Sequence, residues 1–118
     1  MKYVEAQYSV KETILRPIFE ELVELGRSLG KDVKICSCKT IVPLYRSHVF
    51  AQIRPTTNAR IDLGLCLITY DGKLPERLVD TGGLDKKDRI THRIELTSTN
   101  QIDADLTKWL KLAYSLDQ

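Results

Sequence analysis

The stretch Ala59-Arg60-Ile61-Asp62-Leu63-Gly64-Leu65-Cys66-Leu67-Ile68 decides the fold of this chain. Its apolar residues recur at every second position from Ile61 to Leu67, and Arg60, Asp62 and Gly64 stand between them. Because successive side chains of a strand point to opposite faces of a sheet, this pattern predicts a strand with one apolar and one polar face. The apolar face is expected to be buried, and the polar face to be open to solvent or to a ligand.

Four further stretches show a period of two, at residues 33–35, 40–45, 49–54 and 89–97. The turn-forming residues 55–58 are expected to join the third of these strands to the strand of residues 59–68 as an antiparallel hairpin. Pro43 lacks a backbone N–H, so the strand that contains it is expected to lie at an edge or to bulge there.

The hairpin register follows if the turn spans residues 55–59. Arg54 then lies opposite Arg60, Gln52 opposite Asp62, and Phe50 opposite Gly64. This register places Phe50 on the polar face, where its ring would cover the strand glycine.

Two helices flank these strands. A Ser9-Val10-Lys11-Glu12 capping box precedes apolar residues at helical spacing up to Gly30, with Pro17 marking either a kink or the start of the regular helix. Thr99 or Asn100 is expected to cap the second helix. The residues between 70 and 88 are expected to be mostly connection, with a short helix opened by Pro75.

These elements predict a two-layer α+β domain, in which a mainly antiparallel, curved sheet of about five strands carries the N- and C-terminal helices on one face. The expected order is helix, four strands, a loop region with a short helix, one strand and a last helix. A length of 118 residues suits a single domain, so residues 1–118 are expected to form one.

Composition narrows the classes of function. The chain shows no apolar run long enough for a membrane span and no signal peptide, and its three cysteines are an odd number, so we expect a cytoplasmic protein with reduced thiols and no membrane partner. A net charge of +2 is too small to indicate nucleic-acid binding by itself.

No motif assigns catalytic residues or a cofactor. G-x-S-x-G, P-loop and H-E-x-x-H sequences are absent, so no cofactor is expected. A metal site with three thiolate ligands would combine Cys36, Cys38 and Cys66. Structural zinc needs four ligands at a different spacing, so no metal site is expected.

Several segments together carry a resemblance to a known family: Lys39–Val42, Phe50–Pro55, Arg60–Leu65, Thr91–Arg93 and Asp103–Tyr114. In these the chain is similar to an uncharacterised bacterial family that is known only as a domain of unknown function. Some of its members carry the label of predicted transport protein, which implies no mechanism. More distantly, His48–Ala51, Thr91-His92 and the order of elements resemble the MmcQ/YjbR-like fold, which is related in shape to bacterial frataxins.

A binding site for an anion is the leading functional hypothesis. The residues from Val33 to Ile61 include no Asp or Glu but several basic residues. The candidate binding residues are Lys39, Arg54, Arg60 and His92, supported by Phe50, Asp62 and Thr91. A guanidinium group binds phosphate and carboxylate through paired hydrogen bonds, so the predicted partner is a phosphate-bearing small molecule, nucleic acid or an acidic segment of a protein.

Three other interpretations stay open. Arginines beside Asp62 can be a surface salt bridge without any ligand. An enzyme could use His92 with Asp62 or Arg60 on an anionic substrate, although His92 shares the apolar side of its strand and a buried structural histidine explains it more simply. An interaction domain could also dimerise through the exposed sheet, so both a monomer and a homodimer are compatible with the sequence.

Overall fold

The computed structural model describes residues 15–36, 41–57, 60–70, 72–82 and 89–117. The elements in chain order are α2 (Leu15–Ser28), β1 (Lys34–Ile35), β2 (Val42–Tyr45), β3 (Val49–Thr57), β4 (Arg60–Leu65), β5 (Val79–Asp80), β6 (His92–Leu96), the 3-10 helix η1 (Thr99–Gln101) and α3 (Ala104–Leu116). The proposed capping box at residues 9–12 lies outside the described residues, and Pro17 lies in the first turn of α2 as described.

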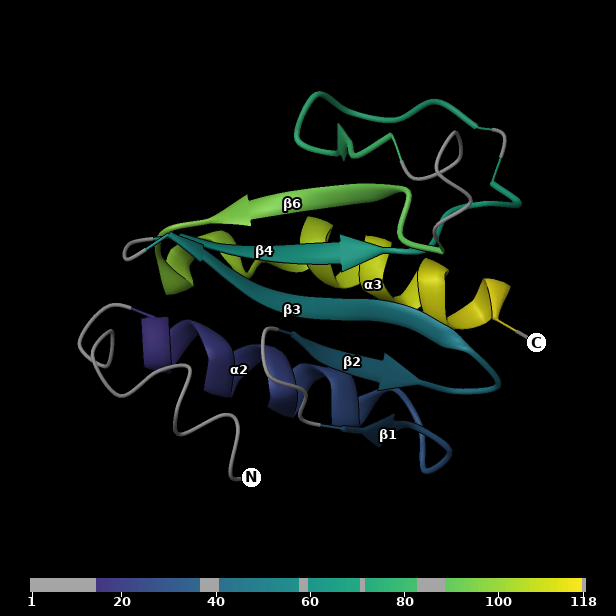
Figure 1. Cartoon of the computed structure of the whole chain (residues 1–118), viewed down its shortest axis with the longest axis horizontal. Coiled ribbons are helices and arrows are strands. Elements are labelled where there is room, and N and C mark those ends of the chain that lie inside the picture. Colours follow the sequence, from purple (N-terminus) through teal and green to yellow (C-terminus); the bar gives the residue numbers. More distant parts are fainter. Residues whose placement is uncertain (1–14, 37–40, 58–59, 71, 83–88, 118) are drawn as a thin grey trace.

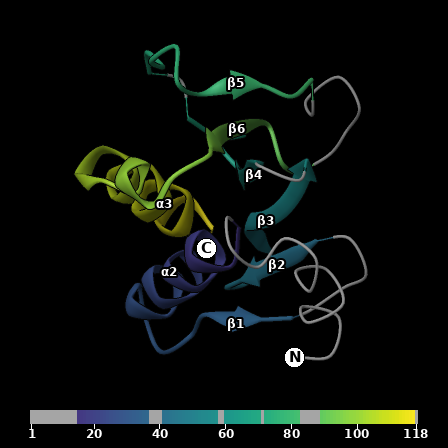
Figure 2. The same cartoon turned by 90° about the vertical axis from the view of Figure 1, so that its left-hand side faces the viewer.

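One antiparallel sheet organises these elements, with its six strands in the order β1-β2-β3-β4-β6-β5. Both α2 and α3 lie on the same face of the sheet (Figures 1 and 2). We call the opposite face, which neither α2 nor α3 covers, the open face. This arrangement confirms the predicted α+β architecture of an antiparallel sheet with an N-terminal and a C-terminal helix on one side.

The core lies between the two helices and the sheet. Ile61, Leu63 and Leu65 of β4 are at most 1% exposed, in agreement with the alternation in the sequence. They belong to one cluster of buried side chains that includes Ile18 and Leu22 of α2 and, from α3, Leu106, Leu110 and Ala113. Burial of these apolar side chains is the main favourable term for the fold.

The segment between β4 and β6 differs from the prediction in two ways. β5 is a sixth strand at the sheet edge, where Val79 pairs with Arg93, and its two residues are too short to show an alternating pattern. The expected helix at Pro75 is wrong, because this residue opens a single turn in which the Leu78 N–H donates to the Pro75 carbonyl over 3.0 Å.

The predicted register of the β3–β4 hairpin is also wrong. Arg54 pairs with Asp62 and Gln52 with Gly64, because β3 continues through Pro55 to Thr57 before the chain turns. A register shift between Pro55 and Thr57 adjusts the ladder next to the proline. Opposite charges therefore face each other across the two strands, where the sequence had suggested two arginines.

A β-bulge explains why Phe50 does not lie on the open face. Leu44 pairs with Ala51 and Tyr45 with Val49, so Phe50 is the extra residue of β3. Its side chain is fully buried, and its ring contacts that of Tyr114 in α3 edge to face, with centroids 5.6 Å apart. The predicted place of Phe50 is therefore wrong. The prediction for Pro43 is wrong as well, because β2 lies inside the sheet, Pro43 pairs in regular register with Gln52, and the extra residue of the bulge belongs to β3.

Gly64 is covered by other side chains. A Cβ atom at this position would lie 2.7 Å from Cγ2 of Ile90 and 3.0 Å from Cγ of Gln52. Only glycine leaves room for this approach, since a real Cβ does not come within 3.0 Å of its neighbours. Ile90 thus packs onto the open face where the sequence had placed Phe50.

The C-terminal helix begins differently from the prediction. Ser98 caps η1 in a capping box with Gln101, and Asp103 then caps α3 by accepting a hydrogen bond from the Leu106 N–H over 2.9 Å. Thr99 and Asn100 lie inside η1 rather than at the start of α3. Neither described helix is long and apolar enough to cross a membrane.

Candidate functional site

Asp62 is the centre of the charged group on the open face. Its side chain accepts a hydrogen bond from Thr56 Oγ1 over 2.6 Å, and its Oδ1 lies 3.0 Å from Arg60 Nε. The contact with Arg60 Nε is ionic, because the two atoms are not aligned as a hydrogen bond. Arg93 Nε approaches the other carboxylate oxygen at 3.8 Å. Two guanidinium groups therefore share the nearly buried Asp62 carboxylate.

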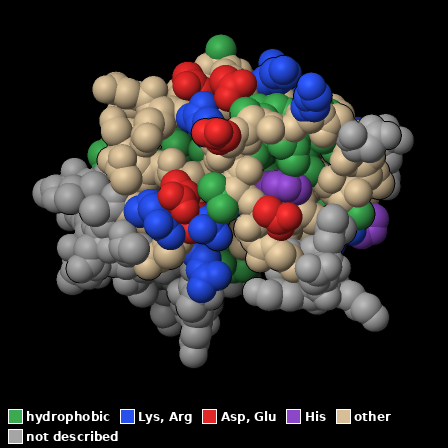
Figure 3. Space-filling view, turned by 90° about the horizontal axis from the view of Figure 1, so that it is seen from above, with side chains coloured by type: hydrophobic (Ala, Val, Ile, Leu, Met, Phe, Trp, Pro, Cys, Tyr) green, Lys and Arg blue, Asp and Glu red, His purple; other side chains and the backbone are tan. Residues whose placement is uncertain are grey.

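Glu95 adds a second carboxylate to this group. Its Oε2 lies 3.1 Å from Arg93 Nη2 and 3.6 Å from Arg60 Nη1. We call Arg60, Asp62, Arg93 and Glu95 the charged strip; its two positive and two negative side chains compensate one another. Figure 3 shows basic and acidic side chains in contact with each other rather than separated into fields of one sign.

The structure brings only part of the predicted anion site together. Arg54 and Arg60 both lie beside Asp62, the former across the ladder and the latter two positions away on the same strand. Arg54 is exposed, and although it lies opposite Asp62 in the ladder, its guanidinium forms no ion pair with a carboxylate of the described residues. Lys39 lies outside the described residues.

His92 lies on the other side of the sheet. It pairs with Leu65 on the helix-covered face, whereas Asp62 pairs with Glu95 on the open face. The residues that the enzyme hypothesis combined, His92 with Asp62 or Arg60, are therefore separated by the sheet.

Thr91 has a structural role. Its side chain is 1% exposed, and Oγ1 accepts a hydrogen bond from the Leu67 N–H over 3.0 Å and lies 2.9 Å from His92 Nδ1. These contacts hold the segment that follows β4 against the start of β6.

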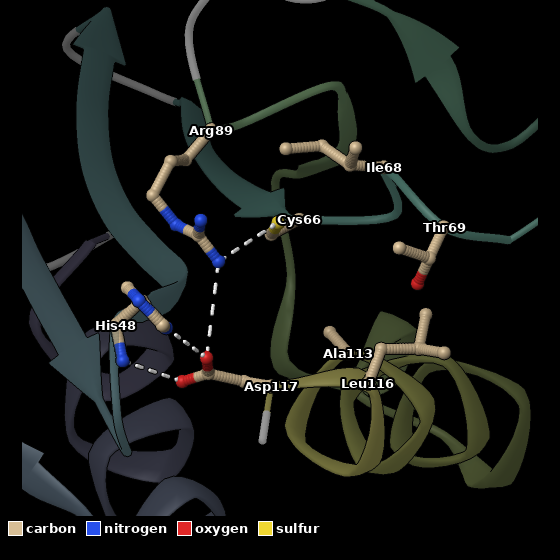
Figure 4. A pocket seen from close by; sticks show the side chains of 8 residues that line it. All are labelled: His48, Cys66, Ile68, Thr69, Arg89, Ala113, Leu116 and Asp117. Atoms are coloured by element: carbon tan, nitrogen blue, oxygen red, sulfur yellow. Dashed lines mark hydrogen bonds and ion pairs between the residues drawn. The ribbon is translucent and has the colours of Figure 1, made fainter.

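A pocket lies at the end of the sheet where β2 turns into β3, β4 ends and α3 ends; we call it the end pocket. Its volume is about 210 Å³. The polar side chains that line it are His48, Thr69, Arg89 and Asp117. The remaining lining is provided by Cys66, Ile68, Ala113 and Leu116. In Figure 4 Arg89, His48 and Asp117 converge on one side of the pocket, and Thr69 and Leu116 lie on the other.

Asp117 is the most constrained of these side chains. It follows the last turn of α3, is 4% exposed, and accepts hydrogen bonds from the backbone N–H groups of Ser47 at 3.0 Å and His48 at 2.8 Å. Burial by itself raises the pKa of this carboxyl, but the hydrogen bonds from His48 and Ser47 outweigh burial, and the pKa is lowered below its ordinary value of 3.8. Asp117 is therefore ionised at neutral pH.

An ionised Asp117 determines the tautomer of His48. His48 Nδ1 lies 2.8 Å from Asp117 Oδ1. Because a carboxylate can only accept hydrogen bonds, Nδ1 must carry the proton, and the lone pair of the neutral imidazole is then on Nε2. The side chain of His48 is 55% exposed, so Nε2 is a hydrogen-bond acceptor within reach of solvent.

Arg89 brings a positive charge to the same place. Its Nε donates to the Val49 carbonyl over 3.1 Å, which holds the side chain across the end of the sheet. Its Nη2 lies 3.6 Å from Cys66 Sγ and 3.8 Å from Asp117 Oδ1. Among the described residues no acceptor is bonded to Nη1, so part of this guanidinium remains available.

The sequence did not predict this pocket. His48 was named only in the resemblance to the MmcQ/YjbR-like fold, and Cys66 only among the three cysteines at which no metal site was expected. Arg89 and Asp117 belong to no sequence motif. Spacing could not reveal the contact between His48 and Asp117 either, because these residues are 69 positions apart in the chain. Among the described residues no group of three or more metal-ligating side chains comes together, and Cys38 lies outside them.

The fold and the end pocket define a small two-layer α+β domain with polar side chains gathered at one end of its sheet. The chain belongs to the family described as Domain of unknown function (DUF5655), whose model matches residues 4–117. This confirms the resemblance to a family without an assigned function. A search of curated proteins found no match, and a search of solved structures found none. The resemblance to the MmcQ/YjbR-like fold and the bacterial origin therefore stay predictions.

Proposed function

We propose that this domain is a binding module for a small anionic molecule, whose carboxylate or phosphate group is bound by Arg89 in the end pocket. The observation that carries the proposal is the state of the Arg89 side chain. One of its nitrogens is fixed to the Val49 carbonyl, while the rest of the guanidinium borders a cavity of about 210 Å³. Guanidinium groups that are already oriented lose less entropy when they bind an anion.

Charge compensation favours the end pocket over the charged strip. Arg60 and Arg93 already contact Asp62 and Glu95, so an added anion would have to compete with the two carboxylates of the protein itself. In the pocket the nearest carboxylate, Asp117, lies 3.8 Å from Arg89 and already accepts hydrogen bonds from the Ser47 and His48 backbone and from the His48 imidazole. The positive charge of Arg89 is therefore less fully compensated by carboxylates than the charges of Arg60 and Arg93.

The size and walls of the pocket limit the ligand. Pockets for drug-sized ligands usually occupy about 300–1,000 Å³, and this one is smaller, so the ligand should have few heavy atoms. Ile68, Ala113 and Leu116 provide apolar contacts beside the charged groups. A short-chain organic acid or a small phosphate ester fits these properties. Nucleic acid and acidic protein segments, which the sequence also suggested, would need a wider basic surface.

Titration of the labelled protein with succinate and with inorganic phosphate, followed by amide NMR shifts, tests the proposal. We expect the shifts to concentrate at residues 47–49, 66–69, 89 and 113–117. The Arg89→Gln variant should bind about tenfold more weakly, since a hydrogen bond to a charged group contributes about 1.5–3 kcal/mol.

Arg54→Gln is the matched control, because it removes an exposed arginine from the open face without touching the end pocket. Its affinity for the two anions should equal that of the wild type. The proposal is overturned if Arg54→Gln weakens binding and Arg89→Gln does not, which would place the site on the open face with Arg54 and Arg60. Shifts that respond only to a DNA oligonucleotide would overturn the small-molecule assignment.

A further inference from the structure

We propose that His48 and Asp117 form a general-base pair, and that the domain hydrolyses small esters of an anionic acid in the end pocket. This inference rests on the proposed function, because it takes Arg89 as the group that holds the acid. It goes beyond binding, since it assigns a chemical step to Nε2 of His48. Ester hydrolysis at this site needs only water and the side chains of this chain.

The position of Asp117 supports this assignment. Its Oδ2 accepts from two backbone N–H groups of the β2–β3 turn, at 3.0 Å from Ser47 and 2.8 Å from His48, and its Oδ1 contacts the imidazole. The same turn thus carries both the imidazole and the donors that orient its carboxylate partner. An imidazole held by a buried carboxylate in one tautomer is the arrangement that activates histidine as a base in hydrolases. Asp117 acts as a positioning residue, and His48 is the catalytic residue.

Arg89 lies close enough to place a substrate beside this base. The imidazole Nδ1 and the guanidinium Nη2 both contact Oδ1 of Asp117, at 2.8 and 3.8 Å. The protonated Nδ1 of the imidazole and the guanidinium therefore flank a single oxygen atom (Figure 4), and the basic Nε2 lies on the opposite edge of the same ring. A substrate whose charged end binds the guanidinium would present a carbonyl only a few bonds away to the pocket side of the imidazole.

Water is the nucleophile that the exposure of His48 favours. More than half of the side chain reaches solvent, with an exposed fraction of 55%, so a water molecule can bind to the Nε2 lone pair. Nε2 takes a proton from this water as the oxygen bonds to the ester carbonyl carbon. The bond from that carbon to the alcohol oxygen then breaks, and its electron pair leaves on the alcohol oxygen. The imidazolium returns the proton to the alcohol, which yields one carboxylic acid and one alcohol.

Cys66 is the other nucleophile of the pocket. Its side chain is 7% exposed, and its sulfur faces Arg89 Nη2 at 3.6 Å. The contacts of the imidazole are with Asp117, and Cys66 has no part in that hydrogen-bond group. The water route therefore needs fewer rearrangements than a route through the thiol.

A matched pair of substrates tests the proposal: the mono-4-nitrophenyl ester of succinic acid, which keeps one carboxylate, and the neutral 4-nitrophenyl butyrate. Wild-type protein should release nitrophenolate from the charged ester faster than buffer does, and faster than from the neutral one. His48→Gln should lower the rate by about 100-fold, in the range of general-base catalysis. Arg89→Gln should remove the preference for the charged ester.

Two controls change residues outside the end pocket. His92→Gln changes the other of the two histidines of the chain, Arg54→Gln changes an exposed arginine of the open face, and both variants should keep the full rate. Asp117→Asn tests positioning: kcat should fall while KM for the charged ester stays the same, because Arg89 is still present. Amide NMR spectra of each variant establish that it is folded.

The catalytic proposal is overturned if His48→Gln hydrolyses the charged ester as fast as the wild type, or if Cys66→Ser alone abolishes the reaction. Wild-type rates equal to buffer would overturn it as well. If succinate binding still depends on Arg89 in these cases, the proposed binding function stands and only the catalytic step fails. Loss of both would show that the end pocket is not the site.

Discussion

Nδ1 of His48 and Oδ1 of Asp117 lie 2.8 Å apart, although 69 residues separate them in the chain. The contact joins the β2–β3 turn to the end of α3, and the backbone N–H groups of Ser47 and His48 donate to the same carboxylate. A carboxylate at the negative end of a helix dipole is unfavourable by itself. The three donors, together with Arg89, offset this cost and keep Asp117 charged in a nearly buried position.

The Asp117→Asn variant is expected to reverse the tautomer of His48. The amide oxygen can still accept from the backbone of the turn, but the amide nitrogen then donates to Nδ1, so the imidazole proton moves to Nε2. Long-range proton–nitrogen NMR spectra in mildly alkaline buffer should show an Nδ1–H tautomer in the wild type and an Nε2–H tautomer in the variant. The signals of His92 serve as the internal reference and should not change. An Nε2–H tautomer in the wild type would contradict the hydrogen bond to an ionised Asp117.

Stability is expected to fall in acid through Asp117. Its pKa is lowered in the folded protein relative to the ordinary 3.8, so its contribution is fully present above that value and is lost as the pH falls through the lower, folded pKa. Urea unfolding below about pH 4 should therefore show a steeper loss of stability for the wild type than for Asp117→Asn. At neutral pH the variant should be less stable by about 2 kcal/mol, since three hydrogen bonds to a charge are weakened.

The pKa values of two other carboxyls are also lowered, but they do not distinguish the wild type from the Asp117→Asn variant. The Tyr114 hydroxyl is the main cause of the lowered pKa of Asp32, and the Leu106 N–H is that of Asp103. Both are present in the wild type and in Asp117→Asn, so their effect cancels in the comparison. Parallel acid profiles of the two proteins would contradict the assigned role of Asp117.

Asp62 should matter more for stability than Glu95, although both pair with the same arginines. The side chain of Asp62 is 11% exposed and also accepts from Thr56, whereas that of Glu95 is 38% exposed. Asp62→Ala should lower the free energy of unfolding by about 1–2 kcal/mol because it leaves Arg60 and Arg93 side by side without their shared anion. Glu95→Ala should cost less than about 1 kcal/mol. Equal losses in urea denaturation would show that the charged strip is only a set of solvated ion pairs.

Gly64→Ala is expected to destabilise the sheet by steric overlap. A Cβ atom there would lie 2.7 Å from Ile90 Cγ2 and 3.0 Å from Gln52 Cγ, and overpacking of this kind costs about 1–3 kcal/mol. In the Ile90→Ala background the first of these contacts is absent, so the same substitution should cost clearly less. A double-mutant cycle by thermal unfolding measures the difference. Additive effects would mean that Ile90 does not cover Gly64.

Much of the fold could be predicted because its signals are local. The period of two in β4 and the helical spacing along α3 each report which side of an element is apolar, and burial of those sides leaves few arrangements. The predicted strand pairing was wrong where a single residue shifts the register between two strands. The bulge at Phe50 and the continuation of β3 through Pro55 each change which side chains face one another, and neither has a distinct sequence signal.

The charged strip was predicted in part, whereas the end pocket was not predicted. Arg54, Arg60 and Asp62 were expected on one polar face, and alternation suffices to place them there. Arg89 and Asp117 had no such signal, because their role depends on a meeting of the chain after β4, the β2–β3 turn and the end of α3.

The sequence by itself determined the α+β class, the apolar side of β4 and the presence of polar side chains on its reverse, because alternation and helical spacing are properties of consecutive residues. Only the tertiary structure decided that Arg60 and Arg93 are compensated by Asp62 and Glu95 and that His48 meets Asp117. Ion pairs and hydrogen bonds act over a few ångströms in space. Residues far apart in the chain come within that distance only after the helices and the sheet have packed.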